Sequence, residues 1–113
     1  MTPYRKFEIT FISMLVVLGE KYKKETNNIT LTDYVHFRCL SDAGDRLEIS
    51  YYLSSTLNSY PQLYKKLRTK IREMSEAEDF GTGFTLIEAN QPSHRLRLPG
   101  IKKLLGMVRT KER

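Results

Sequence analysis

The chain has 113 residues and a mass of 13.2 kDa, which is the size of one domain and leaves no room for a second catalytic domain. Its composition, 40% hydrophobic and 28% charged with only four prolines and six glycines, excludes disorder over most of the length. The net charge of +6 indicates an acidic partner without identifying it.

The positive charge is concentrated in two segments. Residues 1–59 carry seven basic and seven acidic side chains and are therefore neutral. Residues 60–74 carry five basic side chains against one acidic, a net charge of +4, and residues 75–90 carry four acidic side chains, a net charge of −4. Residues 91–113 carry seven basic side chains against one acidic, a net charge of +6. An acidic connector thus separates two basic segments.

The N-terminal apolar run is expected to form a helix over about 4–25. Apolar residues recur at steps of three and four along one face: Phe7, Phe11, Met14, Leu15, Leu18 and Tyr22. A second set makes the apolar stripe wider than a surface helix needs: Ile9, Ile12, Val16 and Val17. The helix is therefore either a central core helix or one that packs on its own domain and on a second subunit. Because Glu8 interrupts the run, which is shorter than a membrane span, we expect neither a secretion signal nor a membrane anchor.

A second helix is expected over about 32–43. Thr30 followed by Asp33 resembles a capping box, and Gly44 would end the helix. Cys39 would then be a small core residue. As the only cysteine it excludes an internal disulfide and indicates a reducing compartment, so we expect a soluble cytoplasmic protein.

A short helix over Leu47–Leu57 would follow. It would end at Asn58 and Ser59, either of which can cap the next helix, and Pro61 suits the first turn of that helix. The next helix is expected over about 60–74. Two helices joined by a short turn form the helix-turn-helix pattern.

The helix over 60–74 separates apolar from basic residues. Its apolar stripe consists of Leu63, Leu67, Ile71 and Met74, and its opposite side carries Gln62, Lys65, Arg68, Thr69 and Arg72. Lys66 and Lys70 flank the stripe. No carboxylate occurs before Glu73, whereas an ordinary solvated helix alternates Glu with Lys to form i,i+4 pairs. This pattern favours a surface that binds an anionic partner over one that is merely solvated.

Residues 84–98 are expected to form a β-hairpin that is basic on one side. Phe84–Ala89 is rich in strand-forming residues, and the segment 90–94 has the composition of a turn. Arg95–Pro99 alternates arginine with leucine, which places both arginines on one face of a strand. A short amphipathic helix over about 99–109 would follow.

This order of elements resembles the winged-helix proteins, in particular the MarR-type transcriptional regulators, over nearly the whole chain; its compact size is closer to the Sar-type members. The resemblance implies an α+β, mostly helical fold, a single domain over 1–113 with a winged helix-turn-helix and a two-stranded β-hairpin wing. It implies that 59–72 matches the recognition helix and that 84–98 matches the wing. His94 stands where the family usually has an aspartate before the wing arginine, Arg95.

We therefore expect a sequence-preferring, double-stranded DNA-binding transcriptional regulator whose recognition helix over 60–74 enters the major groove. The expected DNA-binding residues are Ser59, Tyr60, Gln62, Lys65, Lys66, Arg68, Thr69, Lys70, Arg72, His94, Arg95 and Arg97. Among these, Gln62, Lys65 and Thr69 would read bases. The wing would reach the adjacent backbone or minor groove. A homodimer is expected, formed by the helices over 4–25 and 99–109.

Three alternatives have weaker support. The first is a protein-interaction module that uses the winged-helix scaffold to dock a component of the transcription or replication machinery, since several tyrosines would suit an interface. The second is RNA binding, which needs an exposed aromatic platform. The third is catalysis, but His36 and His94 lie on different elements without a recognisable partner. We expect no enzyme activity, no cofactor and no metal site.

Overall fold

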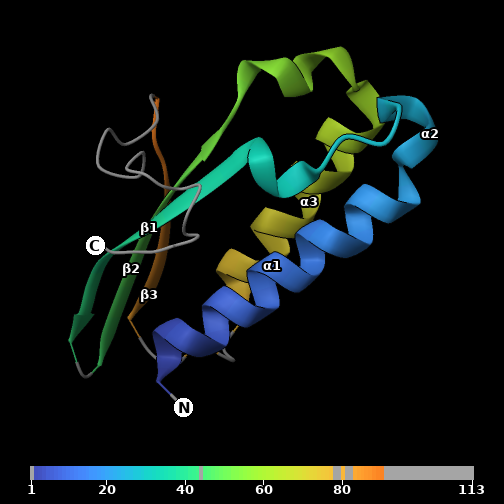
Figure 1. Cartoon of the computed structure of the whole chain (residues 1–113). Coiled ribbons are helices and arrows are strands. Elements are labelled where there is room, and N and C mark those ends of the chain that lie inside the picture. The colour runs from blue at the N-terminus through green and yellow to red at the C-terminus, as the bar shows by residue number, and fades with distance from the viewer. Residues whose placement is uncertain (1, 44, 78–79, 81–82, 91–113) are drawn as a thin grey trace.

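The computed structural model describes residues 2–43, 45–77, 80 and 83–90 (Figure 1). Its elements, in chain order, are helix α1 (Pro3–Lys21), the short helix α2 (Lys23–Thr26), the 3-10 turn η1 (Leu31–Asp33), strands β1 (Val35–Ala43) and β2 (Arg46–Leu53), the 3-10 turn η2 (Ser55–Ser59), helix α3 (Pro61–Glu76) and strand β3 (Phe84–Glu88). The predicted α+β class is confirmed. The winged helix-turn-helix order is not found among the described residues, because helices precede the β-hairpin and one long helix, α3, follows it.

Helix α1 agrees with the sequence prediction. The hydroxyl of Thr2 accepts a hydrogen bond from the backbone N–H of Arg5, and a proline occupies the first turn, so the helix start is capped. The helical run ends in α2 at Asn27, whose φ of 58° lies in the left-handed region. The inner face is buried as expected, with Phe7, Phe11, Leu15 and Leu18 all below 4% exposure.

The two helices expected over 32–43 and 47–57 are wrong, because residues 35–43 and 46–53 form the antiparallel hairpin β1–β2, and only the end of the second, residues 55–57, is helical, within the 3-10 turn η2. Of the expected first helix only η1 is helical, and its capping box does not form, since Thr30 makes no side-chain cap. The sequence of β2 carries the physical reason. Its residues alternate between buried and half-buried, with Leu47, Ile49, Tyr51 and Leu53 on the buried side. These residues are β-branched, aromatic or leucine, which suits a strand with one buried face.

Strand β3 exists where the sequence predicts a strand, but it does not open a separate wing. It pairs in parallel with β2, with Leu47 opposite Phe84 and Tyr51 opposite Glu88, so the sheet has the order β1-β2-β3. A parallel pair needs a crossover connection, which α3 supplies. The predicted return strand over 95–99 and the helix over 99–109 lie outside the described residues.

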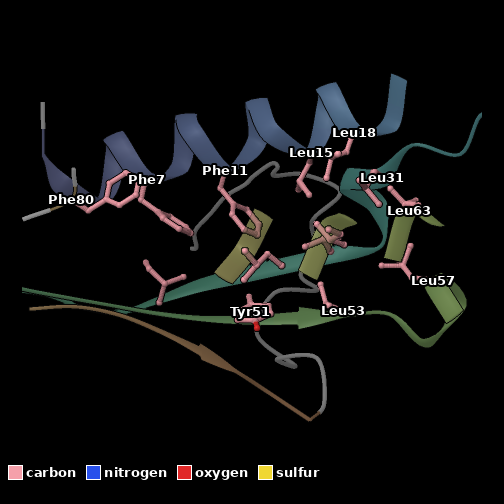
Figure 2. Close-up of a cluster of buried hydrophobic side chains, with 14 of the residues drawn as sticks. Phe7, Phe11, Leu15, Leu18, Leu31, Tyr51, Leu53, Leu57, Leu63 and Phe80 are labelled. Atoms are coloured by element: carbon pink, nitrogen blue, oxygen red, sulfur yellow. The ribbon is translucent and has the colours of Figure 1, made fainter. Parts of the chain in front are cut away.

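The core lies between the sheet and the two long helices. Figure 2 shows side chains of α1 pointing at the sheet, with residues of α3 and η2 completing the cluster. Phe7 is its aromatic centre: the ring lies 5.1 to 5.8 Å from the rings of Phe11, Phe37, Phe80 and Phe84. One core therefore joins the N-terminal helix, the hairpin and the segment that leads into β3.

The bend into β3 provides a test of this topology. Gly83 has a φ of 76°, and a Cβ at this position would lie 2.3 Å from the backbone oxygen of Asp45. We expect Gly83→Ala to lower the free energy of unfolding by at least ~1–3 kcal/mol, because it adds left-handed strain and a backbone clash. The control is Gly19→Ala in α1, where the new Cβ would make an ordinary 3.6 Å contact. It should be neutral or stabilise by up to ~1 kcal/mol. Urea unfolding measures both, and equal effects would contradict the parallel β2–β3 pairing.

Candidate nucleic-acid interface

The candidate site is the outward face of α3. The predicted apolar stripe of this helix is confirmed, since Leu63 and Leu67 are 0% and Ile71 is 4% exposed against the sheet and α1. The opposite side faces solvent. It carries the exposed Gln62, Lys65, Arg68 and Arg72 and the half-buried Thr69, while the half-buried Lys66 and Lys70 flank the apolar stripe. All seven were expected at a DNA interface; five of them share the outward face of the helix and two lie at its edges.

The start of α3 is capped by a side chain that is far away in the sequence. Tyr60 is the N-cap residue and makes no side-chain cap, so the predicted cap at Asn58 or Ser59 is wrong. Instead, the carboxylate of Glu25 in α2 accepts hydrogen bonds from the backbone N–H groups of Gln62, at 3.1 Å, and Leu63, at 2.9 Å. A carboxylate at this end also interacts favourably with the helix dipole. A separation of 37 residues hides this cap from any local sequence pattern.

Two residues that were expected to contact DNA form ion pairs with carboxylates of the protein itself. The guanidinium of Arg68 donates to both carboxylate oxygens of Glu88, at 2.8 and 3.2 Å, and to the hydroxyl of Tyr64, at 3.2 Å. The ammonium of Lys70 lies 3.7 Å from the carboxylate of Glu73. Arg68 thereby ties α3 to the end of β3. It is a structural residue in this fold, and the sequence contains no signal for its partner.

Three cations of this helix have no such partner. Within the part of the chain that the structure describes, Lys65, Lys66 and Arg72 form no salt bridge with a carboxylate. Lys65 and Arg72 are two turns apart and share the exposed face. Thr69 lies between them, and its hydroxyl donates to the backbone oxygen of Lys65 at 3.1 Å. Lys65 and Arg72 form an electropositive surface on this face, with Lys66 at its edge, and this surface is available to an anion.

The other expected site residues lie apart from this surface or outside the description. Ser59 is exposed at the end of η2, whereas Tyr60 is half-buried and packs against the core. His94, Arg95 and Arg97 lie outside the described residues. Within the described residues, the structure therefore places one basic helix at the surface.

The described segments also contain one cysteine, Cys39, and one histidine, His36, which lie on β1 and away from the outward face of α3. No group of three or more His, Cys, Asp or Glu side chains in these segments could hold a metal ion. Burial raises the pKa of the Cys39 thiol, which is the opposite of what an activated nucleophile requires. Burial also lowers the pKa of His36, which stacks on Tyr52 with ring centroids 6.4 Å apart. Among the same residues, no helix has the length and apolar character needed to cross a membrane.

Comparison with known proteins finds no match. No family model, no curated protein sequence and no solved structure matches it. The likeness to MarR-type regulators is therefore a likeness of sequence pattern alone, and function has to be argued from the surface of α3.

The contact between α3 and β3 predicts a pH effect. Hydrogen bonds from Arg68 hold the pKa of Glu88 below its usual value, so the carboxylate stabilises the folded state once it is ionised. This contribution is present above the unfolded-state pKa and is lost as the pH falls through the folded-state pKa. Because the pair is partly exposed, we expect Glu88→Gln to cost about 0.2–1 kcal/mol at neutral pH, and the difference from wild type to vanish in acid.

The control for this experiment is Glu73→Gln, which removes the same charge from the exposed pair Lys70–Glu73 within α3. It should cost less than Glu88→Gln at neutral pH. Urea unfolding of the three proteins between neutral and acidic pH measures the effect. A Glu88→Gln cost that stays constant down to acidic pH would show that the carboxylate charge does not contribute.

Proposed function

We propose that this domain binds duplex DNA through the outward face of α3 and acts in the regulation of transcription. One observation carries the proposal: Lys65, Lys66 and Arg72 lie without a carboxylate partner, among the described residues, on a helix whose other side is locked into the core. A solvated helix that served no partner would be expected to pair such cations with Glu or Asp at i,i+4. Phosphate groups are the partners that such a surface attracts.

The spacing of these side chains suits a DNA groove. Gln62, Lys65, Thr69 and Arg72 follow one face of the helix over about 15 Å of its axis, at ~1.5 Å per residue. The major groove is about 12 Å wide and admits an α-helix along its course. The outward face of α3 can therefore enter the groove with Lys65 towards the base edges and Arg72 near a phosphate. Gln62 and Thr69, on the same side of the helix, can then meet base edges.

Sequence preference is the finer part of the proposal. Glutamine recognises adenine through paired hydrogen bonds, and threonine and lysine donate to acceptors on base edges. We assign Gln62, Lys65 and Thr69 to this role, and Lys66 and Arg72 to phosphates. The basic segment 91–113, with His94, Arg95 and Arg97, would add to the electrostatic attraction through its net charge of +6.

Docking of another protein is the second candidate function, and a separate surface supports it. Helix α1 exposes four large apolar side chains, which are typical of an interaction surface: Ile9, Ile12, Val16 and Val17. Because these residues lie on α1 and the unpaired cations lie on α3, mutations can test the two functions independently.

The DNA-binding proposal is tested by reversing charge on α3. We expect Lys65→Glu combined with Arg72→Glu to abolish binding to a random duplex pool in fluorescence anisotropy, because two cations that attract the DNA become carboxylates that its phosphates repel. The matched control, Lys21→Glu with Lys24→Glu, produces the same net charge from two exposed lysines of α1 and α2 and should bind nearly as wild type does. The salt dependence should follow a slope of about −0.9 per phosphate contact.

A third variant distinguishes the contribution of α3 to DNA binding from that of the basic C-terminal segment. Arg95→Glu with Arg97→Glu changes the charge by the same amount outside α3. We expect it to weaken binding less than the α3 variant. If the α3 variant binds like wild type, or if only the C-terminal variant loses binding, α3 is not the DNA-binding surface.

A further inference from the structure

The ion pair between α3 and β3 lies beside the cations that we assign to DNA. Arg68 is four residues before Arg72, which places it one turn away and about 40° around the helix, on the same exposed face. Its side chain is 42% exposed, and that of its partner Glu88 is 38% exposed. An anion that approaches Arg72 therefore also approaches Arg68, whose charge a carboxylate of the protein already neutralises.

Two tyrosines hold this pair in place. Tyr51 is only 8% exposed, and its side chain hydrogen-bonds Glu88, which is the residue opposite it in the register of β2 and β3. The hydroxyl of Tyr64 accepts a hydrogen bond from Arg68 at 3.2 Å, and the guanidinium lies 5.5 Å from the centre of the Tyr64 ring. Arg68 and Glu88 are therefore oriented towards each other by the fold, on the helix side and on the strand side.

The pair can nevertheless be exchanged. An exposed ion pair contributes little to stability, because solvent screens it. A phosphate forms the same charge-assisted, bidentate hydrogen bonds with a guanidinium as a carboxylate does, so DNA is a competitor of the same kind as Glu88. The carboxylate also has a second effect, since its negative charge stands beside the face that phosphates would approach.

We propose that Glu88 is an autoinhibitory residue, which competes with DNA phosphates for Arg68 and keeps α3 below the affinity that its cations could reach. This inference rests on the proposed DNA-binding function of α3. Removing the charge of Glu88 should release Arg68 to the phosphates and strengthen binding, even though it weakens the fold. A purely structural ion pair would give the opposite result, because loosening α3 from β3 could only weaken binding.

The second ion pair of α3 offers a matched control. Glu73→Gln removes the same charge and also frees a cation, Lys70, whose ammonium lies 3.7 Å from the carboxylate of Glu73. Lys70, however, is two residues before Arg72 and therefore lies about 160° around the helix from it, at the edge of the apolar stripe. The two substitutions thus match in net charge and differ in which cation they release.

Fluorescence anisotropy with the random duplex pool compares the two full-length variants with wild type. We expect Glu88→Gln to bind several-fold more tightly than Glu73→Gln at low salt. One additional phosphate contact steepens the salt slope by about 0.9, so this advantage should fall by about 3-fold between ~50 and ~200 mM salt. Circular dichroism should show both variants folded, because both ion pairs are partly exposed.

A second pair of variants tests whether Arg68 is the cation released. We expect the advantage of Glu88→Gln over Glu73→Gln to disappear when Arg68→Gln is added to both, because the cation to be released is then missing. If the advantage keeps its size, Glu88 acts only as a repelling charge, and the competition for Arg68 is wrong. If Glu88→Gln binds no more tightly than Glu73→Gln, the autoinhibition is wrong although α3 still binds DNA. If neither wild type nor any variant binds the duplex pool, the proposed function itself fails, and this inference fails with it.

Discussion

The parallel pairing of β2 with β3 is the constraint on which the rest of the molecule depends. Two parallel neighbours cannot be joined by a tight turn, so the chain must cross over one face of the sheet. Helix α3 makes this crossover and has to lay its apolar stripe on the sheet to do so. Once Leu63, Leu67 and Ile71 are fixed there, the positions between them are forced outward. The electropositive surface is thus a consequence of the topology as much as of the local sequence.

The second helix on this face is held by a different interaction. Phe7 lies within 5.8 Å of four other aromatic rings, which come from α1 itself, β1, the segment before β3 and β3. This contact fixes the rotation of α1 about its axis. The rotation buries one apolar face of a helix that has two, so the other remains in solvent. Rotating α1 to bury Ile12 instead would remove Phe7 and Phe11 from the core, which costs more apolar burial than it gains.

The sequence predicts the two long helices well because each repeats its apolar pattern over several turns. The sequence does not predict strands β1 and β2, because a short apolar stretch fits both the two-residue period of a strand and the 3.6-residue period of a helix. Leu47, Ile49, Tyr51 and Leu53 alternate as a strand should, yet Ile49, Leu53 and Leu57 also lie four residues apart, as on a helix. The strict alternation, together with the β-forming composition, was the stronger signal. The partners of α3 could not be predicted at all, because Glu25 and Glu88 meet it only through the tertiary fold.

The pairing of Arg68 with Glu88 reduces the number of cations that α3 can offer to DNA. With Arg68 bound to Glu88 and Lys70 near Glu73, three unpaired cations remain within the described part of the helix. With Lys66 and Arg72 on phosphates and Lys65 on a base edge, the helix alone gives a salt slope of only about −1.8, which corresponds to weak binding. Two such surfaces held in one particle would bind with an avidity well above that of either, because the second contact becomes intramolecular. The basic segment 91–113, with its net charge of +6, is one source of such a second surface. By this argument, the outward face of α3 is one part of the proposed DNA-binding surface, and tight binding needs a second part.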